Sequence, residues 1–477
     1  MARRNFVSPM RIYFIGICGT AMGNGALLLR ALGHEIAGSD DNIYPPMSLL
    51  LAEQGITILS GYHASHLDPL PDIVVVGNAI SRGNEEVEAV LERRIPYISL
   101  PELLKREVIQ GKNSIVVTGT HGKSTTSSLM AWTLESAGRN PNFLIGGVPE
   151  NFKQGYQARP DSEFVVLEGD EYDTAFFDKR SKFFHYLPTT LLINNIEFDH
   201  ADIFNSLDEI KLVFKRLTNL VPRNGLIIAN GDDPNVIEIL QDSPAPVWTF
   251  GISHNVTFRA VDIRYTDHSS IFTVRALGHP EATLEIPMLG EFNVRNALAV
   301  AAAARHHGLT FEEIQQAFST FKSIKRRLEL KGVFGGVTVY DDFAHHPTAI
   351  RETLRALRQR YPNERMIAIF EPRSNTTRRN IFQKELAECF DDANIVFISQ
   401  IARLNLLKEE ERLDPVQVMN DLYARGKKAF YLPDAAAIAA QIAEIAKPGD
   451  VAIVMSNGNF GGIHDMLKKA LTNIDRE

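Results

Sequence analysis

The sequence predicts an α/β protein of three domains: a Rossmann-like first domain, a central P-loop ATPase-type domain, and a doubly wound α/β domain at the end. The chain has 477 residues, and about 150 residues is usual for one domain. Two strand-like segments each lead into a glycine-rich turn and then a helical segment. Late in the chain, short apolar strands alternate with helical stretches. We expect the domains to span residues 1–111, 112–324 and 325–477.

Composition indicates an ordinary globular protein, with 44% hydrophobic and 23% charged residues. The net charge of −8 and the absence of a basic stripe argue against a nucleic-acid partner. No apolar run reaches the roughly 20 residues that cross a bilayer, so no membrane partner is expected. Cys18 and Cys389 lie far apart and favour a reducing compartment over a disulfide scaffold. We therefore expect a cytoplasmic protein.

The first domain opens on a glycine turn between a strand and a helix. Its glycines follow the pattern G-x-G-x-x-G except that Cys18 replaces the middle glycine. Such a turn at a helix N-terminus suits a diphosphate, and an acidic residue about 20 positions later suits a ribose contact. A second strand ends at Asp40, and a further strand at 72–77 ends in a loop that should lie beside this turn. The predicted substrate residues of this domain are Gly16, Cys18, Gly19, Thr20, Asp40 and Asn78.

The central domain is organised around residues 114–130, SIVVTGTHGKSTTSSLM. A buried strand, a glycine-bracketed turn, a lysine and a hydroxyl residue before a helix form the construction of a phosphate-binding loop. Val117 stands where the first glycine of G-x-x-x-x-G-K-[ST] would be. A plain capped turn is the alternative, but the flanking strand and helix favour phosphate binding. The predicted nucleotide ligands here are Gly119, Thr120, His121, Gly122, Lys123, Ser124 and Thr125.

Polar residues follow the next strands, which we expect at 164–167, 190–194 and 226–229. The carboxyl ends of parallel strands meet at one edge of a sheet, so these residues should lie near the phosphate loop. Mg²⁺ bound to a triphosphate needs oxygen ligands, which favours a metal site over a solvated turn. We expect neighbouring carboxylates to orient the ring of His200. The residues concerned are Glu168, Asp170, Glu171 and Asp173 after the first strand, and Asp199, His200 and Asp202 after the second.

Later segments predict an antiparallel accessory sheet at 247–287, an alanine-rich helix at 293–306 and the last domain. In that domain we expect strands at 337–341, 366–370, 395–398, 429–432 and 451–455. A polar cluster that closes the first of these strands favours a site over a routine turn. Two arginines at the domain junction indicate either a solvated linker or an interdomain phosphate site. These residues are Asp341, Asp342, His345 and His346 in the cluster, and Arg326 and Arg327 at the junction.

A phosphate loop plus a separate glycine turn implies two nucleotide-like ligands, ATP and a diphosphate-bearing substrate. That pair suggests a ligase that activates a carboxylate. The segments GTHGKST, LEGDEYD, NIEFDHAD, NVRNALAVAAAA, KRRLE, DDFAHHPT and SNGNFGGIH together resemble the Mur ligases, the ATP-dependent amide-bond ligases of peptidoglycan synthesis. The resemblance covers the whole chain in order. It implies three domains that bind, in turn, a UDP-sugar, ATP and the incoming amino acid or peptide.

The resemblance also implies roles for individual residues, with ATP and Mg²⁺ as cofactors. Lys123 would hold the β- and γ-phosphates, Ser124 and Glu168 one Mg²⁺, and His200 a second. Arg327 would contact a phosphate from the hinge, which makes Lys123, Glu168, His200 and Arg327 the expected catalytic set. The remaining implied contacts are Asn293 and Asn296 near the adenine, Asp342 to the nucleotide, and His345 and Arg373 to the acceptor.

Several segments, among them GICGTAMG, FFDKRSKF and EPRSNT, resemble the branch of the family that attaches a whole peptide. Residues 373–376 depart from the HRFTRT-type stretch of the L-alanine-adding branch. The resemblance thus implies UDP-N-acetylmuramate and the murein tripeptide L-alanyl-γ-D-glutamyl-meso-diaminopimelate as substrates, joined through an acyl phosphate in peptidoglycan recycling. We expect a monomer or weak dimer.

Three alternatives stay open. The nearest is the L-alanine-adding ligase, which performs the same reaction on a different amine. A folate polyglutamate ligase fits poorly because it leaves the first glycine-turn domain unexplained. A non-catalytic nucleotide sensor would not need the metal ligands implied at Glu168 and His200.

Overall fold

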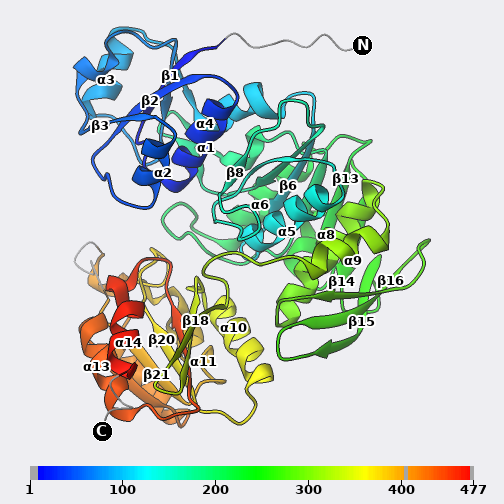
Figure 1. Cartoon of the computed structure of the whole chain (residues 1–477), viewed down its shortest axis with the longest axis vertical. Helices are drawn as coiled ribbons and strands as arrows, with labels where there is room; N and C mark the ends of the chain where they lie inside the picture. Colours follow the sequence, from blue (N-terminus) through cyan, green and yellow to red (C-terminus); the bar gives the residue numbers. More distant parts are fainter. Residues whose placement is uncertain (1–8, 402–406, 473–477) are drawn as a thin grey trace.

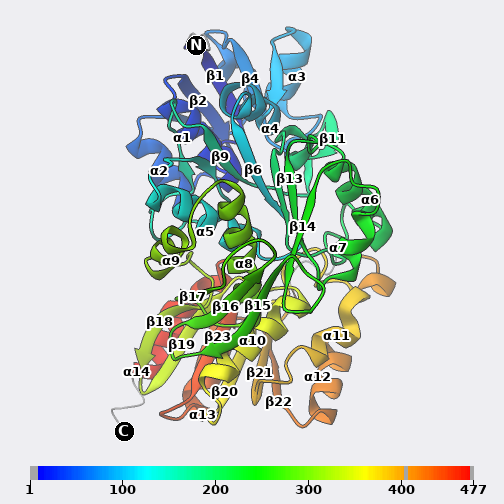
Figure 2. The same ribbon diagram turned by 90° about the vertical axis from the view of Figure 1, so that its right-hand side faces the viewer.

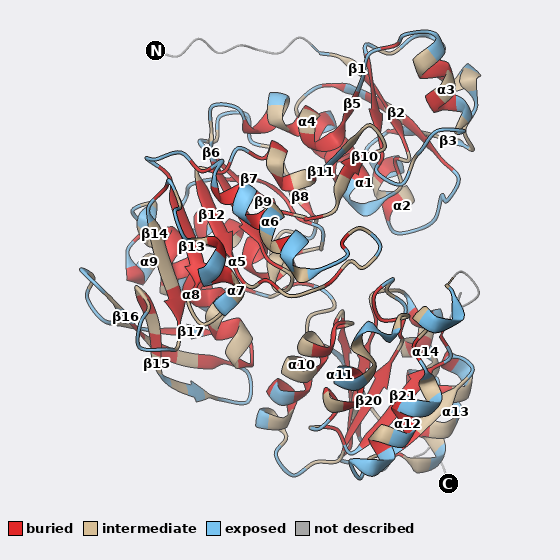
Figure 3. Ribbon diagram, turned by 180° about the vertical axis from the view of Figure 1, so that it is seen from behind, coloured by how far each residue is buried: buried red, intermediate tan, exposed pale blue. Residues whose placement is uncertain are grey.

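The computed structural model describes residues 9–401 and 407–472, which form three α/β domains, each around its own sheet (Figure 1). The strands of all three sheets are largely buried, whereas exposed residues gather on the outer helices and loops (Figure 3). No helix within the described ranges is both long and apolar enough to cross a membrane.

The first domain is a parallel sheet of five strands in the order β3-β2-β1-β4-β5, as expected for a Rossmann-like unit. The strand order reverses between β1 and β4, and the loops after these two strands carry the glycine turn and Asn78. The elements are β1 Arg11–Ile15, α1 Thr20–Ala31, β2 Glu35–Asp40, α2 Met47–Glu53, β3 Thr57–Ser60, β4 Ile73–Val76, α3 Glu85–Glu92, β5 Tyr97–Ser99 and α4 Leu100–Leu104.

The central domain has one sheet of ten strands in the order β17-β16-β15-β14-β13-β12-β6-β9-β7-β8. Alternate residues of β6 face different cores, Val116 on one side and Ile115 and Val117 on the other, so both faces of the sheet are buried. The strands are β6 Asn113–Thr118, β7 Asn142–Leu144, β8 Tyr156–Gln157, β9 Phe164–Glu168, β12 Thr190–Ile193, β13 Leu226–Asn230, β14 Val247–Gly251, β15 Phe258–Tyr265, β16 Ser270–Ala276 and β17 Ala282–Ile286.

The antiparallel strands predicted within 247–287 are present as β15 to β17, but the prediction that they form an accessory sheet is wrong, because they belong to the central ten-stranded sheet. Strand β14 pairs in parallel with β13, and the antiparallel strands β15 to β17 continue outward from it in the same sheet. This continuation gives the backbone groups of β13 a partner instead of an open edge. A small hairpin, β10 Asp173–Ala175 and β11 Asp178–Ser181, was not predicted. The helices are α5 Lys123–Ser136, α6 Leu207–Thr218, α7 Pro234–Ile239, α8 Glu291–His306 and α9 Phe311–Ser319.

The third domain has six strands in the order β18-β19-β23-β20-β21-β22, all parallel except β18 (Figure 2). The antiparallel edge strand β18 was not predicted; the other five strands were. The elements are β18 Glu329–Phe334, β19 Val337–Asp342, α10 Pro347–Arg360, β20 Met366–Phe370, α11 Gln383–Glu388, β21 Ile395–Ser399, α12 Pro415–Ala424, β22 Lys428–Leu432, α13 Ala435–Ile445, β23 Val451–Met455 and α14 Ile463–Thr472.

Candidate active site

The phosphate loop connects β6 to the N-terminus of α5. Gly119 has φ +126° and Gly122 has φ +82°, conformations that favour glycine. Gly122 is the N-cap of α5 and offers no side-chain cap, so the first amides of the helix point into an uncapped position suited to an anion. The backbone N–H of His121 donates to Oδ1 of Asn195 at 2.7 Å, which fixes the loop to the segment after β12.

Lys123 is paired with a buried carboxylate beside the loop. Its Nζ lies 2.9 Å from Oε2 of Glu171 and donates to the carbonyl oxygen of Gly119 at 2.7 Å. Burial alone lowers the pKa of Lys123, but the charges of Glu171 and neighbouring acidic residues raise it above its ordinary value. The ammonium is therefore charged and lies within the loop that would enclose phosphate.

Glu171 also contacts the predicted histidine, with 2.9 Å between its Oε1 and Nε2 of His200. Burial lowers the pKa of His200, and the nearby Glu171 and Asp199 carboxylates raise it above the usual value. The prediction that Asp199 and Asp202 orient this ring is wrong. His200 has φ +56°, and its ring reaches the segment after β9, while Oδ1 of Asp199 accepts the backbone N–H of His200 at 2.7 Å.

Hard oxygen donors suited to Mg²⁺ meet at the start of α5. The hydroxyl of Ser124 donates to Oε1 of Glu168 at 2.7 Å, and Oε2 of Glu168 accepts the N–H of Gly146 at 2.8 Å. A hydroxyl and a carboxylate beside a phosphate loop match the donors that Mg²⁺ prefers, so these residues fit the metal.

The other two predicted carboxylates are paired with lysines. Oδ2 of Asp170 lies 2.6 Å from Nζ of Lys182, and Oδ2 of Asp173 lies 2.6 Å from Nζ of Lys179. Asp173 belongs to the β10–β11 hairpin and not to the end of β9. Of the four acidic residues, Glu168 thus contacts the loop hydroxyl and Glu171 the loop lysine.

A cavity of about 460 Å³ lies between the central and third domains. Its wall includes His121 and Gly122 of the phosphate loop and apolar side chains such as Leu328 and Leu330. A wall that combines a phosphate loop with apolar side chains is suited to a nucleotide, which has both phosphate groups and a base. The structure brings seven predicted residues to its wall: His121, Gly122, Thr125, Asn293, Asn296, Arg327 and Asp342.

These cavity residues differ in how firmly the protein already holds them. Asn293 donates through Nδ2 to the carbonyl oxygen of Leu289 at 2.8 Å. Asp342 accepts the N–H groups of Leu328 at 2.7 Å and Ala344 at 2.8 Å. The bond to Leu328 fixes the hinge, the chain segment 325–328 that joins the central and third domains. The guanidinium of Arg327 makes no hydrogen bond or ion pair with any residue that the structure describes; it lies 5.1 Å from the ring centroid of Phe343. Arg327 is therefore available to a ligand.

In the third domain, His345 and Arg373 follow β19 and β20, whose carboxyl ends share one edge of the sheet. Nε2 of His345 lies 4.0 Å from Oδ2 of Asp199 in the central domain. The exposed Arg373 side chain packs over Gly458, so close that a β-carbon there would lie 2.6 Å from its Nη1. His345 thus faces the central domain, and Arg373 lies on the same edge.

The predicted residues of the first domain gather where its strand order reverses. The N–H of Cys18 donates to Oδ2 of Asp40 at 2.8 Å, and Oδ1 of Asp40 accepts the N–H of Asn42 at 2.9 Å. Burial and the charge of Asp40 raise the pKa of the Cys18 thiol to about 11. Gly16 has φ +84°, Gly19 caps α1 without a side-chain bond, and Thr20 and Asn78 are exposed beside them.

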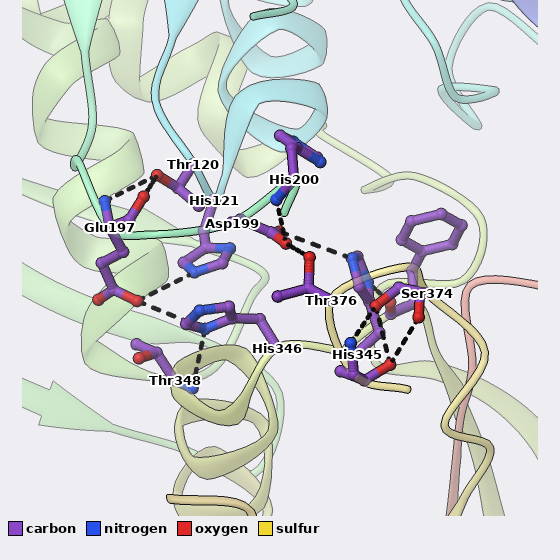
Figure 4. A network of polar contacts seen from close by, with 12 residues as sticks. Thr120, His121, Glu197, Asp199, His200, His345, His346, Thr348, Ser374 and Thr376 are labelled. Atoms are coloured by element: carbon purple, nitrogen blue, oxygen red, sulfur yellow. Dashed lines mark hydrogen bonds and ion pairs between the residues drawn. The ribbon is translucent and has the colours of Figure 1, made fainter. Parts of the chain in front are cut away.

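Sequence reasoning missed Glu197 and the role of Thr376, which bond predicted site residues across the interface of the two domains (Figure 4). Oε2 of Glu197 lies 3.2 Å from Nε2 of His121 and 3.4 Å from Nδ1 of His346. His346 also caps α10, since its Nδ1 accepts the N–H of Thr348 at 3.2 Å. The hydroxyl of Thr376 donates to Asp199 at 2.7 Å. Polar residues directly after buried strands were the available signal, but they do not identify the partner across a domain interface.

Three family descriptions match successive parts of the chain. They are "Mur ligase family, catalytic domain" over residues 11–110, "Mur ligase middle domain" over residues 117–304, and "Mur ligase, glutamate ligase domain" over residues 326–458.

Relatives extend the similarity over nearly the whole chain. The UDP-N-acetylmuramate–L-alanyl-γ-D-glutamyl-meso-2,6-diaminoheptandioate ligase of Escherichia coli is 45% identical over 97% of this chain and 98% of its own length. The UDP-N-acetylmuramate–L-alanine ligase of Syntrophus aciditrophicus is 33% identical over 97% and 94%. The crystal structure of a murein peptide ligase from Psychrobacter arcticus has a TM-score of 0.73 and 39% identity over 97% of this chain and 99% of that one. The chain belongs to the Mur ligase family.

Proposed function

We propose that this protein is an ATP-dependent ligase that joins the murein tripeptide L-alanyl-γ-D-glutamyl-meso-diaminopimelate to UDP-N-acetylmuramate in peptidoglycan recycling. The observation that carries this proposal is the grouping of three residues around the phosphate loop, whose His121 and Gly122 line the cavity between two domains. Lys123 and His200 both contact Glu171, and Glu168 bonds the neighbouring Ser124. The greater identity to the tripeptide-adding relative, 45% against 33% for the L-alanine-adding one, supports the larger acceptor.

In this proposal the lactoyl carboxylate of UDP-N-acetylmuramate attacks the γ-phosphate of ATP, giving an acyl phosphate and ADP. The free amine of the peptide then attacks the acyl carbon, and phosphate leaves. Negative charge gathers on phosphoryl oxygens, so fixed cations and amides perform most of the catalysis. Lys123 and the N-terminus of α5 hold the phosphates, and Arg327 approaches them from the hinge.

Ser124 and Glu168 would hold one Mg²⁺ and His200 would contribute to a second; bound there, the ions neutralise phosphate charge. Glu171 keeps Lys123 charged and in place until the nucleotide enters. Asn293, Asn296 and Asp342 line the part of the cavity that would take the nucleoside, and His345 and Arg373 would meet the acceptor. The glycine turn of the first domain from Gly16 to Thr20, with Asp40 and Asn78, would take the UDP group.

We further propose domain boundaries near residues 111 and 324, a monomer or weak dimer, and action in the cytoplasm, where ATP is available.

The test is phosphate release with ATP, Mg²⁺ and UDP-N-acetylmuramate, with either the tripeptide or L-alanine as acceptor. We expect release with the tripeptide and little with L-alanine. Release with L-alanine alone would make the protein an L-alanine-adding ligase. No release that depends on both substrates would favour a nucleotide sensor.

A further inference from the structure

The loop that carries His200 is bonded to the third domain by contacts to which no role has yet been given. The hydroxyl of Thr376 donates to Oδ1 of Asp199 at 2.7 Å and accepts the N–H of Ala201 at 3.3 Å. Nδ2 of Asn375 donates to Oδ2 of Asp202 at 2.9 Å. The bonded residues of the loop, Asp199, Ala201 and Asp202, therefore lie on both sides of His200 in the sequence. Their partners in the third domain all belong to one segment after β20.

The hydrogen bond between Thr376 and Asp199 is buried, so its loss would destabilise the folded protein. Asp199 is 4% exposed and Thr376 is 2% exposed. The same Oδ1 of Asp199 accepts the backbone N–H of His200 at 2.7 Å. Without the hydroxyl, a buried carboxylate would lose a donor and a backbone N–H would lose its acceptor.

His200 itself adopts a backbone conformation that needs support. Its φ of +56° is uncommon for a residue with a side chain. Its carbonyl oxygen accepts the N–H groups of Ile203 at 2.9 Å and Phe204 at 3.0 Å, which closes a tight turn. Figure 4 shows Thr376 and Asp199 facing each other below the His200 ring, which points away from their contact. The threonine thus acts on the main chain of His200, not on its imidazole.

We propose that Thr376, assisted by Asn375, is a positioning residue that couples docking of the third domain to the conformation of His200. The phosphate site is complete only when the domain proposed to bind the acceptor is seated on the central domain. This inference rests on the proposed function for its kinetic consequence, while the coupling itself is a property of the protein without ligands.

The chain offers a matched control next to Thr376. Thr377 is also 2% exposed, but its Oγ1 lies 2.8 Å from Oγ of Ser374 within the third domain. Thr376→Val and Thr377→Val therefore remove equally buried hydroxyls, one across the interface and one inside a domain. Thr376→Ser keeps the hydroxyl. Asn375→Ala changes an exposed side chain and is not expected to endanger folding.

The first measurement is amide hydrogen exchange of the segment 198–204 in the full-length protein without ligands. We expect exchange at least about tenfold faster in Thr376→Val, and also faster in Asn375→Ala. Thr377→Val and Thr376→Ser should exchange like the wild type. Wild-type exchange in both Thr376→Val and Asn375→Ala would overturn the proposal.

The second measurement is steady-state turnover with ATP, Mg²⁺, UDP-N-acetylmuramate and tripeptide. We expect kcat of Thr376→Val to fall at least about tenfold, with the KM for ATP changed less than about twofold, and Thr376→Ser to restore kcat. Equal losses in Thr376→Val and Thr377→Val would refute a specific coupling. If the wild type itself does not turn over, the proposed function fails, and the exchange measurement alone decides the coupling.

Discussion

At the scale of single residues, the phosphate-binding role proposed for Lys123 can be tested against a control lysine that precedes strand β6. Lys112 precedes β6 and donates to the carbonyl oxygens of Pro160 at 3.2 Å and Ser162 at 2.5 Å, far from the phosphate loop. We expect Lys123→Ala to abolish ADP release while the protein stays folded, because His200 still faces the buried Glu171. Lys112→Ala should keep nearly full activity. Product formation at the wild-type rate by Lys123→Ala would contradict the assignment of this loop as a phosphate-binding loop.

Among the acidic residues, contacts distinguish the proposed metal ligand Glu168 from Asp173, which forms an ion pair. Glu168 bonds the hydroxyl of Ser124, whereas Asp173 pairs with Lys179 in a hairpin. We expect Glu168→Gln to raise the Mg²⁺ concentration for half-maximal turnover about tenfold or more, since an anionic oxygen ligand is lost. Asp173→Asn should leave this concentration unchanged. A Mg²⁺ titration of phosphate release measures both, and equal shifts would contradict the assignment of Glu168.

At the scale of elements, Gly122 and Gly138 lie just before and just after α5. Comparing alanine substitutions at these two positions distinguishes the effect of a steric clash from the effect of backbone strain. A β-carbon on Gly122 would lie 2.8 Å from Oδ1 of Asn296 and 2.9 Å from Nδ2 of Asn194, whereas one on Gly138 would meet nothing within 4 Å. Both residues have positive φ, so alanine costs about 1 kcal/mol of stability at either position. We expect only Gly122→Ala to lose nucleotide binding, measured by calorimetry with ADP. Loss in both variants would mean that helix stability, not loop shape, controls binding.

The C-cap of α8 makes the stability of the central domain sensitive to acid. Burial lowers the pKa of His307 to about 4, and its Nε2 lies 3.0 Å from the hydroxyl of Thr190. The unfolded chain has an ordinary pKa near 6.5, so it binds the proton first as pH falls from about 6.5 to 4, and stability falls in that window. We expect the wild type to lose up to about 3 kcal/mol more than His307→Gln.

Urea unfolding at pH 7 and pH 4.5 tests this difference. Fluorescence reports the central domain because both tryptophans, Trp132 in α5 and Trp248 in β14, belong to it. The same pH dependence in wild type and variant would show that His307 is not the group responsible.

The sequence predicted those elements whose conformation is determined by residues nearby in the chain. The phosphate loop and the strands that precede polar residues follow from short patterns, and β6, β9, β12 and β13 were found where expected. The antiparallel strand β18 was missed, because its residues alternate weakly and its pairing partner β19 decides its conformation. Glu171, which orients His200, follows β9, whereas His200 follows β12 on the other side of β6. Because the sheet order brings these two segments together, the aspartates nearby in sequence were a natural but wrong choice.

At the scale of the whole molecule, the candidate nucleotide cavity exists only because the third domain rests on the central one. Its wall combines Gly122 and Asn296 of the central domain with Asp342 and Arg327 beyond the hinge. Cross-domain pairs such as Thr376 with Asp199 close the interface at the phosphate end. The wall thus depends on the relative placement of two sheets, which sequence patterns within one domain do not specify. A nucleotide that binds between the two domains therefore stabilises their docked arrangement.

The adjacent arginines at the hinge allow this linkage to be tested. Arg326 donates to the carbonyl oxygen of Ser456 at 2.6 Å and lies 3.3 Å from Asp341, both within the third domain, whereas Arg327 makes no such bond with the described residues. We expect Arg327→Ala to change the ligand-free unfolding temperature only slightly, because it loses the contact with the Phe343 ring but no hydrogen bond or ion pair with the described residues. It should weaken ADP binding at least about tenfold. At a ligand concentration about 100-fold above Kd, binding stabilises the wild type by about 2.7 kcal/mol, so the ligand-induced rise in unfolding temperature should shrink in Arg327→Ala.

Arg326→Ala should show the opposite pattern, a ligand-free protein destabilised by about 1 kcal/mol or more with a nearly normal rise on adding ADP. Differential scanning fluorimetry of both variants, with and without ADP and Mg²⁺, measures the two effects together. If the two variants behaved alike, the hinge would act only as a structural joint. If Arg327→Ala alone lost the ligand-induced rise, the junction itself would contribute to nucleotide binding, and docking of the third domain would be linked to occupancy of the phosphate site.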